Sequence, residues 1–414
     1  MPSGMTGTRH ARFAPSPAAL AVWALVAVVA PAAAQTRDEP YGFARGRVTF
    51  GGEIAGSVAP RDDEAFFNYT DYERDTLRMA RLRLFGQWRI AQPVSLVGEL
   101  RTENADQLDL SALYLRWRPL ASREFDIQIG RIPPVVGAFA RRAYGRDNLV
   151  IGLPLAYQYL TSLRPDALPG SVDDLLRMRG RGWRPAFPIG SQSVAPGVPL
   201  VSATRWDTGI EARWKTGWIE TAAALTRGAP AVPVVRETNG GRQWSARAAV
   251  HLPLGMTIGV SGARGQWIED DVLALVPEDR REHSTQSVLG TDVEYGVGHW
   301  LVRAELLRSV FQIPILAMPS ETPLTAWSGF VEARYRWHPR WQVAGRAEKI
   351  DFGALLGTAG VPTPWDAPVT RLEGVVGFRA TRAIELRAGW QHNWRDAGRI
   401  HERGSPAVQV LYWF

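Results

Sequence analysis

The sequence predicts an all-β fold, namely an antiparallel up-and-down β-barrel of about 16 strands that crosses a membrane and has a long third loop folding inward. Three observations predict it. Apolar and polar residues alternate at period two in segments of roughly ten residues, short and long connections alternate between these segments, and tryptophans flank the short connections. Such weakly apolar, alternating segments are typical of strands that cross a membrane as part of a closed barrel.

Composition excludes several other classes of protein. The chain has 414 residues, 45% of them apolar, and no cysteine, which excludes disulfide scaffolds and thiolate metal sites. Its basic residues are 46 arginines and only two lysines, Lys215 and Lys349, and the formal net charge is +7. That excess is small for a chain of this length, so we expect no nucleic-acid partner.

The amino terminus has the pattern of a signal peptide. Arg9 and Arg12 precede an apolar run over residues 18–30, and small residues follow up to Ala34. A membrane anchor is the alternative, but the run is shorter than the roughly 20 residues that a helical span needs. We therefore expect residues 1–34 to be removed and residues 35–414 to form a single barrel domain.

Individual segments show the alternation clearly. Residues 327–337 place Trp327, Val331 and Trp337 on one face and Glu332 and Arg334 on the other. A soluble sandwich would also alternate, but the crowding of arginine and glutamate on one face favours a water-filled lumen. The predicted pore-wall residues are Arg81, Arg83, Arg116, Arg247, Arg334, Arg346, Arg387, Glu53, Glu99 and Glu332.

The connections predict the strand count and the orientation. Outer-membrane barrels have short turns on the periplasmic side and longer loops outside. Short links fall near residues 90–93, 119–124, 215–217, 253–255, 296–298, 338–340 and 381–383. Longer segments fall near residues 59–75, 103–107, 131–205, 227–241, 265–286, 308–324, 351–368 and 395–406. Seven turns and eight loops make sixteen strands, with both chain ends on the turn side.

Tryptophans mark the turn side of the predicted barrel. Their rings favour the level of the lipid headgroups, where one side is apolar and the other is wet. Those that lie beside the short links form half of a predicted aromatic girdle: Trp88, Trp117, Trp214, Trp218, Trp300, Trp337 and Trp341.

The third loop, residues 131–205, is the predicted constriction. It holds ten arginines against four aspartates, and Ser171, Asp174 and Gly180 predict a short helix within it. An inward loop would give a positive constriction, and rings of arginine select anions. The predicted constriction residues are Arg141, Arg142, Arg146, Arg177, Arg179, Arg181 and Arg184. Two alternatives stay open: the arginines brace the wall or bind lipopolysaccharide or a neighbouring subunit, or Tyr157, Tyr159, Trp183 and Phe187 stack against sugars.

The carboxyl terminus carries a resemblance to a known family. Val408, Val410, Tyr412 and the final Phe414 alternate with other residues, which resembles the assembly signal of Gram-negative outer-membrane barrels. Sixteen strands with a long third loop resemble the porin family, and the glycine–proline stretch over residues 129–137 is similar to one in phosphate-selective porins. The lysine ladder of that group is absent, so phosphate selectivity does not carry over.

The resemblance implies a location and partners. It implies a channel in the outer membrane of a Gram-negative bacterium, through which small anionic or polar solutes diffuse passively. It also implies insertion by the barrel assembly machinery, contact with outer-membrane lipid and lipopolysaccharide, and a homotrimer. No cofactor is expected.

Other functions find weaker support in the sequence. A lipid hydrolase is one alternative, but no histidine lies in a recognisable catalytic motif, and His283 and Ser284 fall in a predicted loop. Glu269, Asp270 and Asp271 could hold Ca²⁺, yet loop carboxylates are usually only solvated. We therefore predict no enzyme activity and no metal site. An adhesive or structural barrel with a blocked lumen is the remaining alternative.

Overall fold

The computed structural model describes residues 40–60, 78–103, 107–120, 124–143, 145–182, 185–193, 195–203, 206–234, 238–315, 323–397 and 401–414. The predicted signal peptide, residues 1–34, lies outside the described residues. No helix in the described ranges is long and apolar enough to span a membrane.

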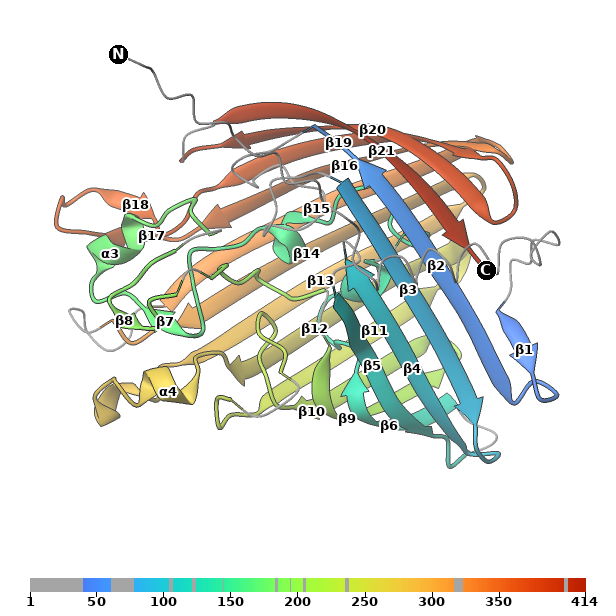
Figure 1. Ribbon diagram of the computed structural model, residues 1–414, viewed down its shortest axis with the longest axis horizontal. Helices are drawn as coiled ribbons and strands as arrows, with labels where there is room; N and C mark the ends of the chain where they lie inside the picture. The colour runs from blue at the N-terminus through green and yellow to red at the C-terminus, as the bar shows by residue number, and fades with distance from the viewer. Residues whose placement is uncertain are drawn as a thin grey trace, which may run out of the picture.

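Sixteen antiparallel strands form one closed barrel, as predicted (Figure 1). Its strands, in chain order, are β2 (Val48–Val58), β3 (Arg78–Arg89), β4 (Val94–Glu103), β5 (Gln107–Trp117), β6 (Glu124–Ile132), β9 (Asp207–Thr216), β10 (Ile219–Thr226), β11 (Gln243–Leu252), β12 (Met256–Gln266), β13 (Thr285–Val297), β14 (Trp300–Gln312), β15 (Pro323–His338), β16 (Trp341–Phe352), β19 (Val369–Arg379), β20 (Ile384–Arg395) and β21 (Glu402–Trp413). Each pairs with its neighbour in sequence, and β21 returns to pair with β2.

The closing seam is completed by both ends of the described chain. Strand β21 pairs with residues 53–58 of β2, and the short strand β1 (Tyr41–Phe43) pairs with residues 48–50 of β2. Between them, Phe414 exchanges backbone hydrogen bonds with Gly52, at 2.9 and 3.0 Å. The Phe414 ring lies about 6 Å from the rings of Tyr41, Phe50 and Tyr412.

The two faces of the barrel wall have opposite character. Outward side chains are mostly large, apolar and exposed, whereas inward positions hold buried polar groups such as Glu53, Glu99, Glu332 and Arg346. In β15 the exposed Trp327 and Val331 alternate with the buried Ser328 and Glu332. Lipid on one side and an ionic interior on the other require this arrangement, which confirms the period-two prediction.

The two ends of the barrel also differ, as the connection lengths predict. Short turns join β3 to β4, β9 to β10 and β15 to β16 at one end, the same end as β1 and Phe414. The seven predicted girdle tryptophans all lie at this end and are at least 40% exposed. The opposite end carries the longer loops with α3 (Val172–Leu176), α4 (Asp270–Leu273) and the hairpin of β17 (Ala354–Leu356) and β18 (Pro362–Pro364) (Figure 1).

Two predicted loop boundaries are wrong by several residues. Strand β14 continues to Gln312, although the loop was expected from residue 308, and β21 begins at Glu402, although the loop was expected to reach residue 406. In β14 the inward Leu307 and Phe311 are apolar because loops cover them, so the apolar–polar alternation fades before the strand ends.

Candidate functional site

The third loop, residues 133–206, leaves the wall at an abrupt break. Gly130 in β6 has φ +133°, and a Cβ there would lie 2.4 Å from the carbonyl oxygen of Leu113. Pro133 and Pro134 follow and lack the N–H groups that would continue the ladder. The loop then runs inside the barrel, where it contains η1 (Ala140–Arg142) and α2 (Leu155–Gln158). It continues at the loop end with the pair β7 (Ala167–Leu168) and β8 (Ile189–Gly190) and with α3 (Figure 1).

Carboxylates of the wall hold the loop by its backbone N–H groups. Glu305 of β14 accepts hydrogen bonds from the N–H groups of Ala138 and Phe139, at 2.8 and 3.0 Å. Glu373 of β19 accepts from Ile151 and Gly152, at 3.0 and 2.9 Å. Glu348 of β16 accepts from Leu155 at 2.6 Å. Charged acceptors give strong hydrogen bonds in such dry surroundings.

Guanidinium groups of the wall hold the same loop by its carbonyl oxygens. Arg346 of β16 donates to the carbonyl of Gly152 at 2.9 Å and to Oδ1 of Asn148 at 2.8 Å, while pairing with Glu332 at 2.8 Å. Arg387 of β20 donates to the carbonyl of Asn148 at 2.9 Å, and Arg303 of β14 to that of Asp147 at 2.7 Å. The wall arginines and glutamates thus serve as clamps on the loop.

Apolar contacts complete the attachment. Phe139 and Tyr157 of the loop pack with Leu307 and Phe330 of the wall, and Ile151 packs with Val375. These wall residues face inward and are buried. The loop is therefore fixed mainly along β12 to β20, and the polar faces of β3 to β5 remain on the opposite side of the ring.

Replacing Gly137 by alanine should loosen this attachment. Gly137 has φ +76°, and an added Cβ would lie 2.2 Å from the hydroxyl oxygen of Tyr157, which donates to Glu305. The left-handed backbone alone costs about 1–2 kcal/mol for a residue with a Cβ. We expect a lower melting temperature and faster proteolysis within residues 133–206. Gly374→Ala is the control, since nothing lies within 4 Å of its Cβ; equal behaviour of the two variants would contradict the prediction.

The outer part of the loop joins other loops in a buried apolar core. Leu163, Leu168 and Leu175 pack with the fully buried Trp267 and Trp365. The sequence-predicted helix is present here as α3, with the Asp174 N–H donating to Ser171 Oγ at 3.2 Å. This core covers the loop end on the side of β10 to β19.

A buried carboxylate fastens this core. Asp366, between β18 and β19, accepts hydrogen bonds from the N–H groups of Ser162 at 2.6 Å and Gly180 at 2.8 Å and from the hydroxyl of Tyr159 at 3.1 Å. Burial raises the pKa of Asp366, and the hydrogen bonds from these donors act in the opposite direction.

The structure divides the predicted constriction arginines into two groups. Arg141 and Arg142 of η1 lie inside the barrel and pair with Glu211 of β9 and Glu294 of β13, and the exposed Arg146 lies over the ring of Trp413. Arg177 and Arg179 lie instead among the loops and pair with Asp174 and Asp396, and Arg181 is exposed nearby. Arg184 and Trp183 lie outside the described residues.

The predicted pore-wall residues all lie on the inward face, but most are engaged in ion pairs or in holding the loop. Arg83 pairs with Glu99 at 2.8 Å, Arg247 with Asp292, and Arg387 with Glu385 at 2.6 Å. Glu53 accepts the N–H of Arg146 at 3.3 Å, and Arg81 is buried beside β2. Solvent still reaches Arg83, whose side chain is 23% exposed, and the half-buried Arg116 and Arg247.

Two basic clusters remain near the turn end of the lumen. On β15, the strongest charges acting on Arg334 are the repulsive Arg336 and Arg303, and no carboxylate of the described chain lies within ion-pair distance of Arg334. On β5, Arg116 donates to Gln87 at 2.7 Å and lies near Arg118 and Arg89. Strands β5 and β15 are eight places apart in a ring of sixteen, so these clusters lie on opposite walls.

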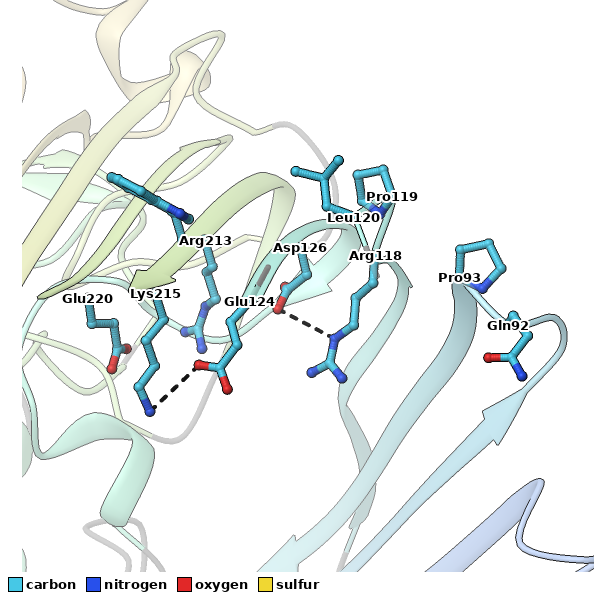
Figure 2. Close-up of a pocket in the computed structure, with 11 residues that line it drawn as sticks. Gln92, Pro93, Arg118, Pro119, Leu120, Glu124, Asp126, Arg213, Lys215 and Glu220 are labelled. Carbon is cyan, nitrogen blue, oxygen red and sulfur yellow. Dashed lines mark ion pairs between the residues drawn. The ribbon is translucent and has the colours of Figure 1, made fainter. Parts of the chain in front are cut away.

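A vestibule of about 720 Å³ opens at this end, beside β5, β6, β9 and β10 (Figure 2). Arg118 lies 4.0 Å from Asp126, and Lys215 lies 3.8 Å from Glu124. With Arg213 and Glu220, the charged lining residues comprise three bases and three acids. The charged lining of the vestibule is therefore balanced. It shares Arg118 with the cluster on β5, where Asp126 offsets part of the positive charge.

The sequence analysis did not predict that Glu305, Glu348 and Glu373 position the loop. Each lies at an inward, polar position of a predicted strand, and this position was the only indication in the sequence that the residue faces the lumen. Their function depends on loop backbone groups far away in sequence, which no local pattern shows.

The residues weighed for catalysis and metal binding lie apart from this site. Ser284 is buried, and its hydroxyl donates to the carbonyl of Arg281 at 2.9 Å. Within the described ranges, no group of three or more His, Asp or Glu side chains could hold a metal ion.

Comparisons with known proteins agree with this geometry at the level of fold. No family model and no curated relative matches the chain. Among solved structures, the chain is similar to outer-membrane-expressed OmpT of Vibrio cholerae (9% identity, 89% of this chain and 98% of that chain covered, TM-score 0.54). It is similar to OmpF of Salmonella typhi in a complex with daunomycin (11%, 89% and 97%, 0.54) and to the outer-membrane channel DcaP of Acinetobacter baumannii (10%, 91% and 100%, 0.51). The chain therefore has the closed sixteen-stranded barrel fold of these outer-membrane proteins.

Proposed function

We propose that the protein is an outer-membrane porin of a Gram-negative bacterium, a water-filled channel for passive diffusion of small hydrophilic solutes. The observation that carries the proposal is the interior of the barrel. A clamped loop lies on one side, ionic side chains such as Arg83 and Arg213 remain partly solvent-exposed on the other, and a vestibule of about 720 Å³ opens at the turn end. A barrel of sixteen strands is wide enough to leave such an aqueous path.

The channel is proposed to prefer anions. The support is the pair of arginine clusters on β5 and β15, because basic groups on opposite walls raise the local concentration of anions and oppose cations. Arg142 and Arg146 of the loop add positive charge inside the barrel, whereas Arg177, Arg179 and Arg181 lie among the loops. We therefore assign the preference to wall residues more than to the arginine-rich end of the loop.

Planar bilayers provide the test. We expect discrete conductance steps and, in a salt gradient, a reversal potential of the sign given by anion selectivity. Arg334→Gln combined with Arg336→Gln should lower the anion-to-cation permeability ratio severalfold, because the lumen loses two charges near its exit. Arg177→Gln is the matched control and should change nothing, since that side chain is 69% exposed in a loop.

The outcomes separate the candidate functions. Cation preference in the wild type would overturn the proposed anion selectivity, but the proposed channel function would stand. An absence of steps from correctly folded protein would favour the adhesive or structural barrel.

A homotrimer is proposed as the assembled state. One structure similar to this chain is described as the trimer form of OmpT of Vibrio cholerae. In this chain the outward face of β5, β6 and β9 carries exposed aliphatic residues: Leu108, Leu110, Leu113, Leu115, Ile129 and Ile210. Such a continuous aliphatic surface suits contact with a second copy. Native mass spectrometry of the detergent-solubilised protein should give the mass of three chains.

A further inference from the structure

Three exposed basic side chains stand on the outward face of the strands, among the side chains that the structure describes. Arg264 lies on β12, and Arg308 of β14 and Lys349 of β16 lie on either side of β15. Arg308 and Lys349 each lie eight residues beyond the tryptophan that begins the strand, Trp300 or Trp341. Eight residues at about 3.3 Å each, on strands tilted by about 40°, rise roughly 20 Å above the turn-side girdle. The outward apolar band of such barrels is about 25 Å tall. These cations therefore lie near the loop-side edge of the membrane.

Their electrostatic surroundings leave an excess of positive charge. Lys349 pairs with Asp351 at 2.7 Å on the same face. Arg308 lies over the ring of Trp327, 5.6 Å from its centroid, and has no carboxylate within ion-pair distance in the part of the chain that the structure describes. The ring attracts the guanidinium, and no hydrogen bond within the described part of the chain uses its N–H donors.

An outward groove of about 510 Å³ begins beside Lys349 and crosses β13 to β16 and β19. It forms because Gly329 and Ala347 are small while Leu306, Val331 and Leu372 stand around them. Leu306, Gly329 and Lys349 are register partners across three strands, so the cation lies directly at the groove.

We propose that this patch binds a phosphorylated, acylated lipid of the outer leaflet, namely lipopolysaccharide. Arg308 and Lys349 hold a lipid phosphate, Trp327 lies at the headgroup level, and one acyl chain occupies the groove at Gly329. The inference rests on the proposed outer-membrane location. Charge complementarity selects this occupant, because a cation without a carboxylate partner at the membrane edge matches a phosphate. The aliphatic face proposed for contact between copies lies on β5, β6 and β9, on the other side of the ring.

Binding of purified lipopolysaccharide to the detergent-solubilised, folded protein tests the proposal. Arg308→Gln combined with Lys349→Gln should weaken binding by about five- to thirtyfold, because each basic group near an anionic lipid contributes up to about a factor of five and Asp351 already offsets part of the charge of Lys349. Enzymatically dephosphorylated lipopolysaccharide should bind the wild type as weakly as intact lipid binds the variant. Gly329→Leu, which fills the groove but keeps both charges, should also weaken binding of the intact lipid. The charge-matched control is Arg340→Gln with Arg382→Gln, two exposed residues at the turn end, and it should bind as the wild type does.

Two results would overturn the proposal. One is equal lipid binding by the wild type and the Arg308/Lys349 variant. The other is unchanged lipid binding together with loss of the trimer in native mass spectra, which would assign this face to contact between copies. Conductance of the same preparations is measured in parallel. If lipid binding is absent but conductance steps are normal, the lipid site is rejected and the porin function stands. If conductance steps are absent but lipid binding is normal, the channel function is rejected and the lipid site stands.

Discussion

Arg346→Met should lower the free energy of unfolding by about 3–5 kcal/mol, the range observed when one partner of a buried ion pair is removed. Arg346 is 2% exposed and lies against the rings of both Phe139 and Phe330 while it pairs with Glu332. Its loss leaves the Glu332 carboxylate with Arg303, at 3.6 Å, as its remaining basic partner among the described residues. It also releases the carbonyl of Gly152 and the side chain of Asn148.

The same variant should change the channel current. With the loop less firmly held at residues 148–152, open-state noise in planar bilayers should rise, and the barrel should lose its unboiled gel mobility at a lower temperature. Arg346→Met combined with Glu332→Gln removes both charges and should recover part of the stability. Arg177→Met, which removes an exposed arginine, is the control. A melting temperature and current noise identical to those of the wild type would show that the clamp contributes nothing.

Deletion of Phe414 should reduce the amount of barrel in cells more strongly than any single core substitution. The deletion removes both backbone hydrogen bonds to Gly52, each contributing about 1 kcal/mol, and the aromatic contacts with Phe50 and Tyr412. Phe414→Ala keeps the backbone bonds and should lose about 2 kcal/mol. Phe414→Trp keeps an aromatic ring and should restore most of the yield.

Comparison of cells with refolding in detergent separates stability from assembly. If Phe414 is also an assembly signal, the alanine variant should refold in detergent yet accumulate poorly in the outer membrane. An equal loss of folded barrel in cells and in detergent would show that Phe414 acts only through its contacts at the closing seam.

The barrel was predictable because lipid and lumen act on every strand separately. Each strand must show one apolar and one polar face, so the pattern of residues 327–337 alone predicts β15. The pattern fails where the lumen is not wet: at Leu307 and Phe311 the third loop and its neighbours cover the wall, and apolar residues then face inward. The misplaced boundary of β14 follows directly from that cover.

The candidate site was only partly predictable, because charge counts do not show which groups meet. The sequence placed Arg346 and Arg387 on the wall, but they donate to backbone carbonyls of Gly152 and Asn148, which are 194 and 239 positions away in sequence. Arg177 and Arg179 belong to a local helix end whose position depends on Asp396 and on the core around Trp365. Long-range contacts of this kind follow from the closed topology and not from any short motif.

The clamps on the third loop have a consequence for how the channel could be retuned. Glu305, Glu373 and Arg387 form hydrogen bonds with main-chain atoms of the loop. Every amino acid supplies these atoms, except that proline lacks the N–H group. Side chains on the solvent side of that segment, such as Arg142 and Arg146, can therefore be exchanged while these hydrogen bonds persist. The side chains that face the solutes are therefore different from the residues that hold the loop. A change in solute preference would require only new side chains on an unchanged loop backbone.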